Sequence, residues 1–206
     1  MGPVERVVRP LRAACADPPY LGPAKKLYCA RHPDAAKYDK PETYQRLIEQ
    51  LCDEYDCCAM SLPTPALKYI IPMCPDDVRV IAWTKTIASF KPGVGVAYTW
   101  EVVILRGGRR RTREQWTVRD YCSVPITLKR ELTGAKPAGF CFWMFAVLNL
   151  EPADLYHDVF PGSSAVIVAW DVLKLKSEHL QPACFRGLTF ELTGPLRRAG
   201  IWARLL

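Results

Sequence analysis

The apolar positions of the chain fall into short runs that alternate between strand and helix periodicity. The first run, Leu11–Cys15, predicts a buried strand that ends at the stiff, polar stretch Asp17-Pro18-Pro19-Tyr20. Behind Pro41, which suits a first helical position, residues 42–55 repeat their apolar side chains at helical spacing. A buried strand, a second helix ended by prolines and a further strand are expected at 57–63, 64–74 and 78–85. This order is typical of a parallel sheet covered by helices.

The second half of the chain continues the alternation. Residues 97–108 alternate like a strand and run into RGGRRRTR at 106–113, so the arginine cluster is expected at a loop tip. Lys136-Pro137 precedes an apolar stretch that is long enough for a largely buried helix. The expected strands lie at 116–124, 155–160 and 187–192, and the expected helices at 139–150 and 165–176. The pattern therefore predicts an α/β fold with one mostly parallel sheet.

Length and composition favour one domain. With 206 residues, 50% of them hydrophobic, the chain can bury one sizeable core. It contains no run of about 18 apolar residues, and no apolar segment follows its charged N-terminus, so neither a membrane span nor a secretory signal is expected. We therefore expect a soluble cytoplasmic protein with a single domain over 1–206, in which 176–206 form a C-terminal extension that the pattern does not resolve.

The nine cysteines do not form a metal or disulfide framework. No C-x-x-C pair occurs, and the three histidines do not stand at ligand spacing from one another or from a cysteine pair. The cysteines are odd in number and scattered through apolar segments: Cys15, Cys29, Cys52, Cys57, Cys58, Cys74, Cys122, Cys141 and Cys184. Buried free thiols in a reducing compartment and no bound metal are the expectation.

The net charge of +7 is concentrated in one segment. Residues 106–113 alone carry five arginines. A run of this kind is either a solvated loop or a patch that binds the phosphates of a nucleic acid by releasing counterions. The charge pattern leaves both interpretations open.

Two expected strand ends carry polar or small residues, one at Asp17 and the other near residue 160. In an open parallel sheet, ligands bind outside the carboxyl ends of strands, so two such ends can border one crevice. At the second end, Gly162-Ser163-Ser164 would let the backbone approach a ligand, and the following helix would present free N–H groups. Small residues also simply make turns, and this stretch alone does not decide between the two.

Three motifs occur together in one order: DPPY at 17–20, KP at 136–137 and D-x-F-x-G-S at 158–163. With VIAWTK and the Trp-Glu pair of TWEVVILRGG, this order resembles that of the S-adenosylmethionine-dependent amino-methyltransferases whose catalytic motif precedes the cofactor motif. The chain is similar to the phage-type adenine-methylating enzymes of restriction-modification chemistry and to the messenger-RNA adenosine methyltransferase family. The resemblance covers about residues 12 to 172. It implies a Rossmann-like methyltransferase fold with permuted motif order and helices on both faces of the sheet.

The resemblance also implies a reaction. The enzyme would transfer a methyl group from S-adenosylmethionine to the exocyclic amino group of adenine in DNA, in the host cytoplasm if a phage encodes it. Asp17 and the carbonyl of Pro18 would accept hydrogen bonds from the amino group, Pro19 would help to fix both acceptors, and Tyr20 would stack on the base. The nucleotide would have to be flipped out of the duplex or presented as a single strand.

The remaining site residues follow from the same resemblance. The cofactor would lie against residues of the second and third motifs: Lys136, Pro137, Asp158, Phe160, Pro161, Gly162, Ser163 and Ser164. Lys136 would face its carboxylate. Phosphates would be gripped by Arg109, Arg110, Arg111 and Arg113, with Lys85 lining the crevice. Two positions depart from the family pattern: relatives commonly have glycine in place of Ser164, and Glu191 is the one weak candidate for the acidic residue that holds the cofactor ribose.

Three alternatives to adenine methylation in DNA stay open. The chain could be a catalytically degenerate methyltransferase fold that only binds nucleic acid, which the Ser164 departure favours. It could also act on adenine in RNA, or on the amino group of cytosine. The sequence indicates neither the recognition sequence nor the oligomeric state.

Overall fold

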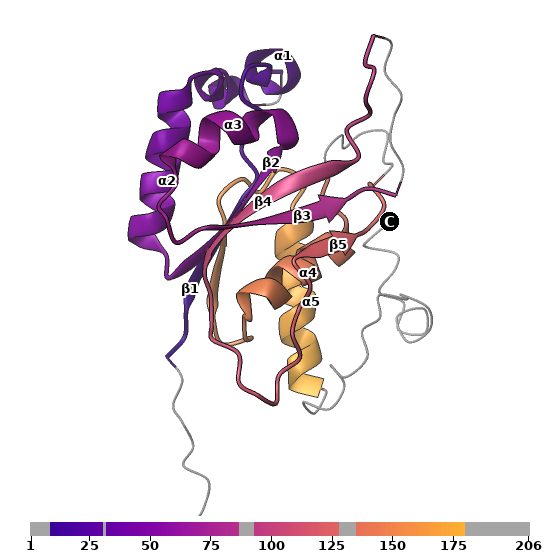
Figure 1. Ribbon diagram of the computed structural model, residues 1–206. Helices are drawn as coiled ribbons and strands as arrows, with labels where there is room; N and C mark the ends of the chain where they lie inside the picture. The colour runs from indigo at the N-terminus through magenta and orange to yellow at the C-terminus, as the bar shows by residue number, and fades with distance from the viewer. Residues whose placement is uncertain (1–8, 31, 87–92, 128–134, 180–206) are drawn as a thin grey trace, which may run out of the picture.

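A mixed six-stranded sheet forms the centre of the protein (Figure 1). The computed structural model describes residues 9–30, 32–86, 93–127 and 135–179. The strands follow the order β5-β3-β4-β2-β1-β6. Their bounds are Arg12–Ala16 (β1), Cys57–Pro63 (β2), Arg79–Thr84 (β3), Trp100–Gly107 (β4), Tyr121–Ser123 (β5) and Leu155–Asp158 (β6).

Five strands share one direction, and β4 alone runs against them. β1 pairs in parallel with β2 and β6, β3 pairs in parallel with β5, and β4 lies antiparallel between β2 and β3. The prediction of a mostly parallel sheet is confirmed. The insertion of β4 between β2 and β3, which both precede it in the chain, was not predicted, because local periodicity does not determine the order of strands in a sheet.

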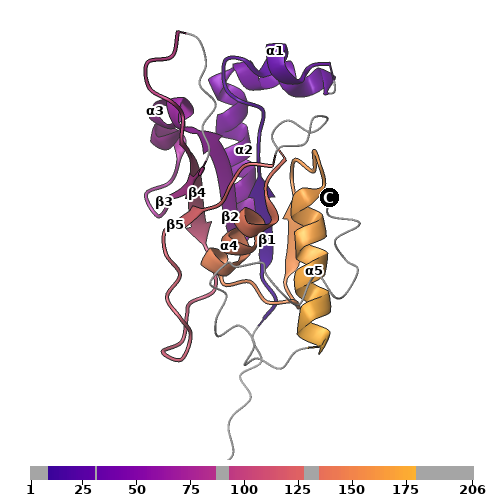
Figure 2. The ribbon, with the colours of Figure 1, turned by 90° about the vertical axis from the view of Figure 1, so that its right-hand side faces the viewer.

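Helices cover both faces of the sheet, as Figure 2 shows. α4 (Ala138–Leu148) and α5 (Ala165–His179) pack on one face, while α2 (Pro41–Glu54) and α3 (Leu67–Ile70) pack on the other. β1 contributes to both cores because successive side chains point to opposite faces, so Ala13 and Cys15 join the first and Ala14 and Ala16 the second. These small side chains let helices approach β1 from either side.

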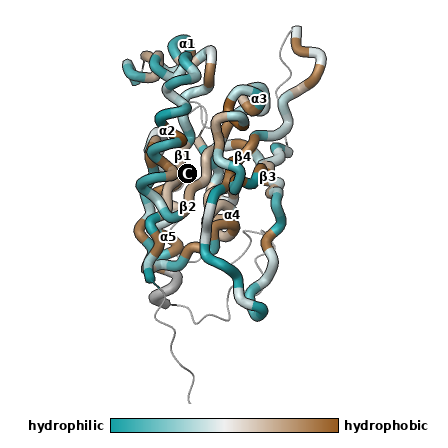
Figure 3. Tube along the Cα trace, turned by 60° about the vertical axis from the view of Figure 1, so that its left-hand side comes forward, coloured by the Kyte–Doolittle hydropathy of each residue, from teal (hydrophilic) through white to brown (hydrophobic). Residues whose placement is uncertain are grey.

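Two short helical elements follow Tyr20, α1 (Ala24–Tyr28) and the 3-10 helix η1 (Pro33–Asp39). The Asp39 carboxylate accepts hydrogen bonds from the backbone N–H groups of Ala24 (2.7 Å) and Lys25 (3.1 Å), which ties η1 to the start of α1. The segment lies beyond the carboxyl end of β1 (Figure 1), and many positions of α1 and α2 are hydrophilic (Figure 3).

Several expected elements are shorter or differently wound than predicted. The helix expected at 64–74 is a series of three short turns, η2 (Thr64–Ala66), α3 and η3 (Ile71–Met73). Pro72, which lacks an N–H donor, falls inside the expected helix and interrupts it. Only Tyr121–Ser123 of the strand expected at 116–124 is paired. The strand expected at 187–192 and the ribose candidate Glu191 lie outside the described residues.

Within the described ranges, no helix is both long enough and apolar enough to cross a membrane. All eight cysteines in those ranges are free thiols, and no three His, Cys, Asp or Glu side chains gather there in a group that could hold a metal ion.

Candidate active site

The chain leaves β1 through a rigid corner at Asp17-Pro18-Pro19-Tyr20. β1 itself is buried from Ala13 to Ala16, and Pro18 is also fully buried. The carbonyl of Pro19 accepts a hydrogen bond of 2.5 Å from the hydroxyl of Tyr44 on α2. Two prolines with restricted φ and this external anchor hold the corner, so the orientation of the Asp17 carboxylate is set by the backbone.

The second predicted corner lies directly beside the first. β6 pairs in parallel with β1 so that Cys15 stands opposite Asp158, and the N–H of Val159 donates to the carbonyl of Cys15 at 2.9 Å. Burial raises the pKa of Asp158, and the nearby negative charge of Asp17 raises it further. The structure therefore brings the DPPY corner and the start of the D-x-F-x-G-S motif to one end of two adjacent strands, although 141 residues (158 − 17) separate them in the chain.

The turn at Pro161–Ser164 leads from β6 into α5. The N–H of Phe160 donates to the Asp158 carboxylate at 3.3 Å, and the N–H of Ser164 bonds to the carbonyl of Pro161. Gly162 has φ +33°, and Ser164 has φ +57°, which is the left-handed conformation that glycine adopts easily. Ser164, the position that departs from the family pattern, thus has the backbone conformation suited to glycine.

We expect Ser164→Gly to stabilise the protein. A residue with a Cβ in the left-handed conformation destabilises the folded protein by about 1–2 kcal/mol, and glycine avoids this strain. The greater freedom of glycine in the unfolded chain offsets part of that benefit, so a net gain of about 0.5–1 kcal/mol in the free energy of unfolding is expected. Urea denaturation measures this gain. Ser163 lacks a positive φ, so Ser163→Gly is the matched control and should lower stability. A Ser164→Gly protein less stable than the wild type would contradict the prediction.

Asp17 belongs to a cluster of two carboxylates and two ammonium groups. Lys136 Nζ lies 3.0 Å from Asp17 Oδ1 and 2.8 Å from Glu101 Oε2, and Lys85 Nζ lies 2.6 Å from Glu101 Oε1. The Tyr20 hydroxyl donates to the same Glu101 Oε1 at 3.2 Å. Glu101 and Lys136 are almost fully buried, whereas the Asp17 side chain stays 27% exposed. The cluster joins the ends of β1 and β3, the start of β4 and the segment before α4.

Burial and pairing shift the pKa values in this cluster in different directions. Burial raises the pKa of Asp17; the Lys136 charge works against that rise and the Glu101 charge adds to it. Burial alone would lower the pKa of Lys136, but the carboxylates of Asp17 and Glu101 hold it well above its usual value. Burial also opposes ionisation of Glu101, yet Lys136 and Lys85 keep the pKa of that carboxyl below its usual value. Glu101 and Lys136 are therefore both charged at neutral pH.

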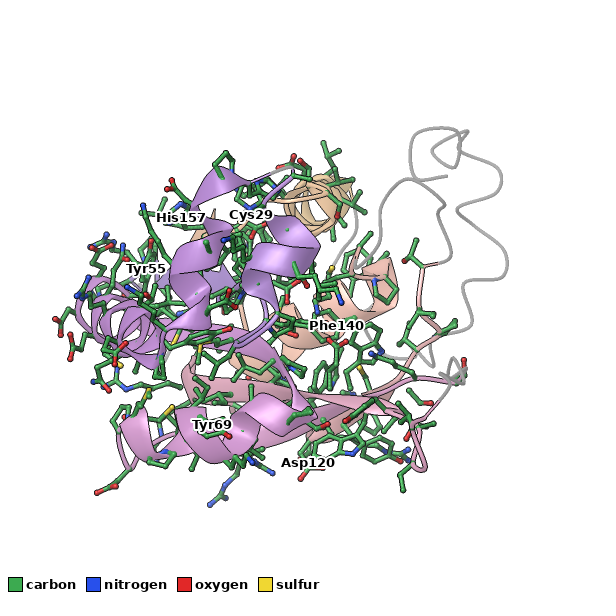
Figure 4. All side chains as sticks on the ribbon, turned by 90° about the horizontal axis from the view of Figure 1, so that it is seen from above. Cys29, Tyr55, Tyr69, Asp120, Phe140 and His157 are labelled. Atoms are coloured by element: carbon green, nitrogen blue, oxygen red, sulfur yellow. The ribbon has the colours of Figure 1, made fainter. Side chains whose placement is uncertain are left out.

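Aromatic rings surround the cluster. Tyr20 meets Tyr28 of α1 edge-on at 5.9 Å between ring centroids, and Tyr38 of η1 meets Phe160 at 5.4 Å. Burial, with the Asp17 charge second, raises the pKa of Tyr28 to about 12. Lys136 Nζ lies 5.3 Å from the ring centre of Trp83 and 5.6 Å from that of Phe140 on α4, which is labelled in Figure 4. The residues after Tyr20 thus place aromatic side chains beside both corners.

Both predicted lysines lie in the cluster. Lys85, expected to contact nucleic acid, pairs with Glu101 and keeps 17% of its side chain exposed. Lys136, expected to face a cofactor carboxylate, is already engaged by two carboxylates of the protein. Pro137 is the N-cap of α4, where its carbonyl accepts the N–H of Cys141 at 3.2 Å.

The arginine loop lies at the opposite end of the sheet from Asp17. β4 starts beside the cluster at Glu101 and ends at Gly107, opposite Cys57 at the start of β2. Its length, on the order of 20 Å, separates the loop from the DPPY corner. The antiparallel course of β4 therefore places Arg109, Arg110, Arg111 and Arg113 away from the DPPY corner, and their contact with phosphates stays a prediction.

Two of these arginines also have internal partners. Arg109 Nη2 lies 2.5 Å from Asp154 Oδ1, and Asp154 is 1% exposed. Arg111 donates to the carbonyls of Ala146 and Trp116. Arg110 and Arg113 are exposed. The run therefore combines structural and solvated arginines.

Three residues that organise the protein were not predicted from the sequence: Glu101, Tyr44 and Asp154. For Glu101 one signal was present, since a carboxylate stood at the start of an otherwise apolar strand and needed a partner once buried. Tyr44 looked like any other apolar position of α2. Nothing in the local pattern distinguished Asp154 from a solvated aspartate.

No protein-family model and no curated protein matches this sequence. Solved structures do match it. The complex of M1.HpyAVI with SAM aligns over 80% of each chain with a TM-score of 0.52 and 15% identity. A second structure of M1.HpyAVI covers 80% of this chain and 77% of its own (TM-score 0.49, 14% identity). TTHA0409 from Thermus thermophilus, whose name refers to a DNA modification methylase, covers 78% and 77% (TM-score 0.47, 13% identity). The first likeness, with the sheet order above, shows a Rossmann-like α/β fold shared with M1.HpyAVI.

Proposed function

We propose that this protein transfers a methyl group from S-adenosylmethionine to the exocyclic amino group of adenine in DNA. The observation that carries the proposal is the adjacency of the Asp17 corner and the 158–164 turn at the end of two parallel strands. A fold of this kind has been solved in complex with SAM, in M1.HpyAVI. The motif order DPPY, KP and D-x-F-x-G-S supports the finer assignment to adenine.

Asp17 and Pro18 are the proposed acceptors for the amino group of the target base. Asp17 Oδ1 is buried, yet among the described residues it has no hydrogen-bond partner, although Lys136 lies 3.0 Å away. A buried carboxylate oxygen without a donor is costly, so it is suited to a donor that arrives with the substrate. Two fixed acceptors would hold the amino nitrogen pyramidal and aim its lone pair. Tyr20, whose hydroxyl is held by Glu101, is the proposed stacking partner of the base.

The second corner is the proposed cofactor contact, through Asp158, Phe160, Pro161, Gly162, Ser163 and Ser164. The left-handed conformation of Ser164 supports this, because the turn keeps a backbone path suited to glycine. When bound, S-adenosylmethionine supplies an electrophilic methyl group on a sulfonium. We propose that Lys136 keeps Asp17 ionised instead of contacting the cofactor carboxylate, since two carboxylates already engage it. The protein's contribution is then alignment and a fixed electrostatic environment.

One experiment tests this function against its alternatives. The purified protein is incubated with labelled S-adenosylmethionine and, in separate arms, with unmethylated duplex DNA, single-stranded DNA and RNA, and the modified nucleoside is identified by mass spectrometry. N6-methyladenine in DNA is the expected product. Methylcytosine, or label in RNA alone, would replace the proposed substrate. Nucleic-acid binding without cofactor binding or transfer would favour a catalytically degenerate binding protein and overturn the proposal.

A further inference from the structure

Glu101 is the centre of the cluster beside Asp17. It is the second residue of β4 and is 5% exposed. Its carboxylate accepts from three side chains that come from three other parts of the chain: Tyr20, Lys85 and Lys136. Because a buried carboxylate with three donors is fixed in place, Glu101 sets the positions of all three donors.

Lys136 lies between the two carboxylates of the cluster. Lys136 Nζ donates to Glu101 Oε2 at 2.8 Å. It lies almost as close to Asp17 Oδ1, at 3.0 Å, yet that oxygen has no hydrogen-bond partner within the described ranges. Lys136 has three N–H donors, so it can bind Glu101 and still bring its positive charge to Asp17. The charge favours ionised Asp17, and Oδ1 keeps a lone pair for another donor.

We propose that Glu101 is a positioning residue for methyl transfer, which fixes the Lys136 ammonium group beside Asp17 and the Tyr20 hydroxyl next to it. This inference rests on the proposed function, since it assigns the free Asp17 oxygen to the amino group of the substrate. Without the Glu101 carboxylate, Lys136 loses the buried acceptor that fixes its position beside Asp17. Tyr20 loses its acceptor at the same time, so the proposed stacking surface is displaced as well.

The charges around Asp17 set the sign of the pH effect. The groups that face Asp17 are Lys136, Glu101 and Lys85 in the cluster, Asp158 on β6, Cys15 on β1, Cys141 on α4, and the hydroxyls of Tyr20, Tyr28 and Tyr44. Glu101 raises the pKa of both Asp17 and Lys136. Its removal therefore lowers both pKa values. A protein merely damaged in its packing loses rate at every pH without this shift.

The test compares Glu101→Gln with the wild type in methyl transfer to DNA. We expect kcat to fall about 100-fold, as for other small displacements of reacting groups, while KM for DNA changes little. Where the ionisation of Asp17 and of Lys136 limits the rate, both limbs of the pH–rate profile move to lower pH, because the pKa values of both groups fall. The matched control is Glu151→Gln, which removes the exposed carboxylate that pairs with Arg109 at the other end of the sheet and should leave kcat unchanged.

A second variant covers the case in which Glu101→Gln does not fold. Lys85→Met together with Glu101→Gln leaves one carboxylate and one ammonium group in the cluster, so its charge is balanced and folding is retained. We expect kcat to stay low, because Lys136 still lacks its Glu101 acceptor. Wild-type kcat in this double variant would overturn the inference.

A third readout does not depend on activity. The Asp17 carboxyl carbon is followed by NMR titration in protein labelled at aspartate, with Asp17→Asn to assign the signal. We expect the pKa of Asp17 to be lower in Glu101→Gln than in the wild type, and an unchanged pKa would overturn the inference. If the wild type transfers no methyl group while this shift is found, the proposed function fails and the control of Asp17 by Glu101 stands.

Discussion

Asp17→Asn is expected to lower the rate of methyl transfer about 10³-fold, the upper range for removal of one fixed polar group from an active site. Asparagine keeps the size of the side chain but loses the charge, and its amide nitrogen cannot accept a hydrogen bond from the amino group of the base. Lys136 retains Glu101 as partner, so the cluster keeps its shape. The measurement is single-turnover transfer from labelled S-adenosylmethionine to unmethylated DNA.

Asp56→Asn is the matched control for this substitution. Asp56 precedes β2 at the opposite end of the sheet, where its carboxylate accepts the N–H of Arg12 at 2.8 Å and pairs with Arg9. The same loss of charge there should leave the transfer rate unchanged. A wild type that transfers methyl groups while Asp17→Asn is equally fast would remove Asp17 from the reaction. Binding of S-adenosylhomocysteine by both variants checks that the cofactor contact persists.

The elements with strong periodicity were predictable. In α2 the helical spacing of Tyr44, Leu47, Ile48 and Leu51 matches the residues that are buried. In β2 the largely apolar run is buried on both faces, as expected for an interior strand. The sequence also indicated that two strand ends would border one site, and the pairing of β1 with β6 brings them together.

The order of strands and the interactions of charged residues were not predictable from local patterns. The periodicity of β4 predicts a strand wherever that strand lies in the sheet. Only its pairing with β2 and β3 decides which charged residues lie near Asp17. That one antiparallel strand carries Glu101 to the site and the arginine run away from it. A pattern of charges along a sequence cannot distinguish these outcomes, because the partner of each charge is remote in the chain.

Asp154 has the strongest effect on stability that the structure predicts. Its carboxylate accepts the N–H groups of Leu11 (2.8 Å) and Glu151 (2.7 Å) and pairs with Arg109. Breaking a buried ion pair by removing one partner costs about 3–5 kcal/mol, because the remaining charge is left uncompensated. We expect Asp154→Ala to lower the free energy of unfolding by this amount in urea denaturation.

The same experiment decides what Arg109 does. If its main partner is Asp154, Arg109→Met also lowers the free energy of unfolding. The double variant then loses less free energy of unfolding than the sum of the two single losses, since neither charge is left alone. Arg110→Met, at the exposed neighbouring position, should change stability by no more than about 0.5 kcal/mol. Equal stability of Asp154→Ala and the wild type would contradict the structural role of the Asp154–Arg109 pair. Arg109 would then be available for phosphate contacts. Because β1 begins directly after Leu11, loss of the Asp154 anchor loosens the strand that carries Asp17, so methyl transfer should decline at temperatures where the wild type is still active.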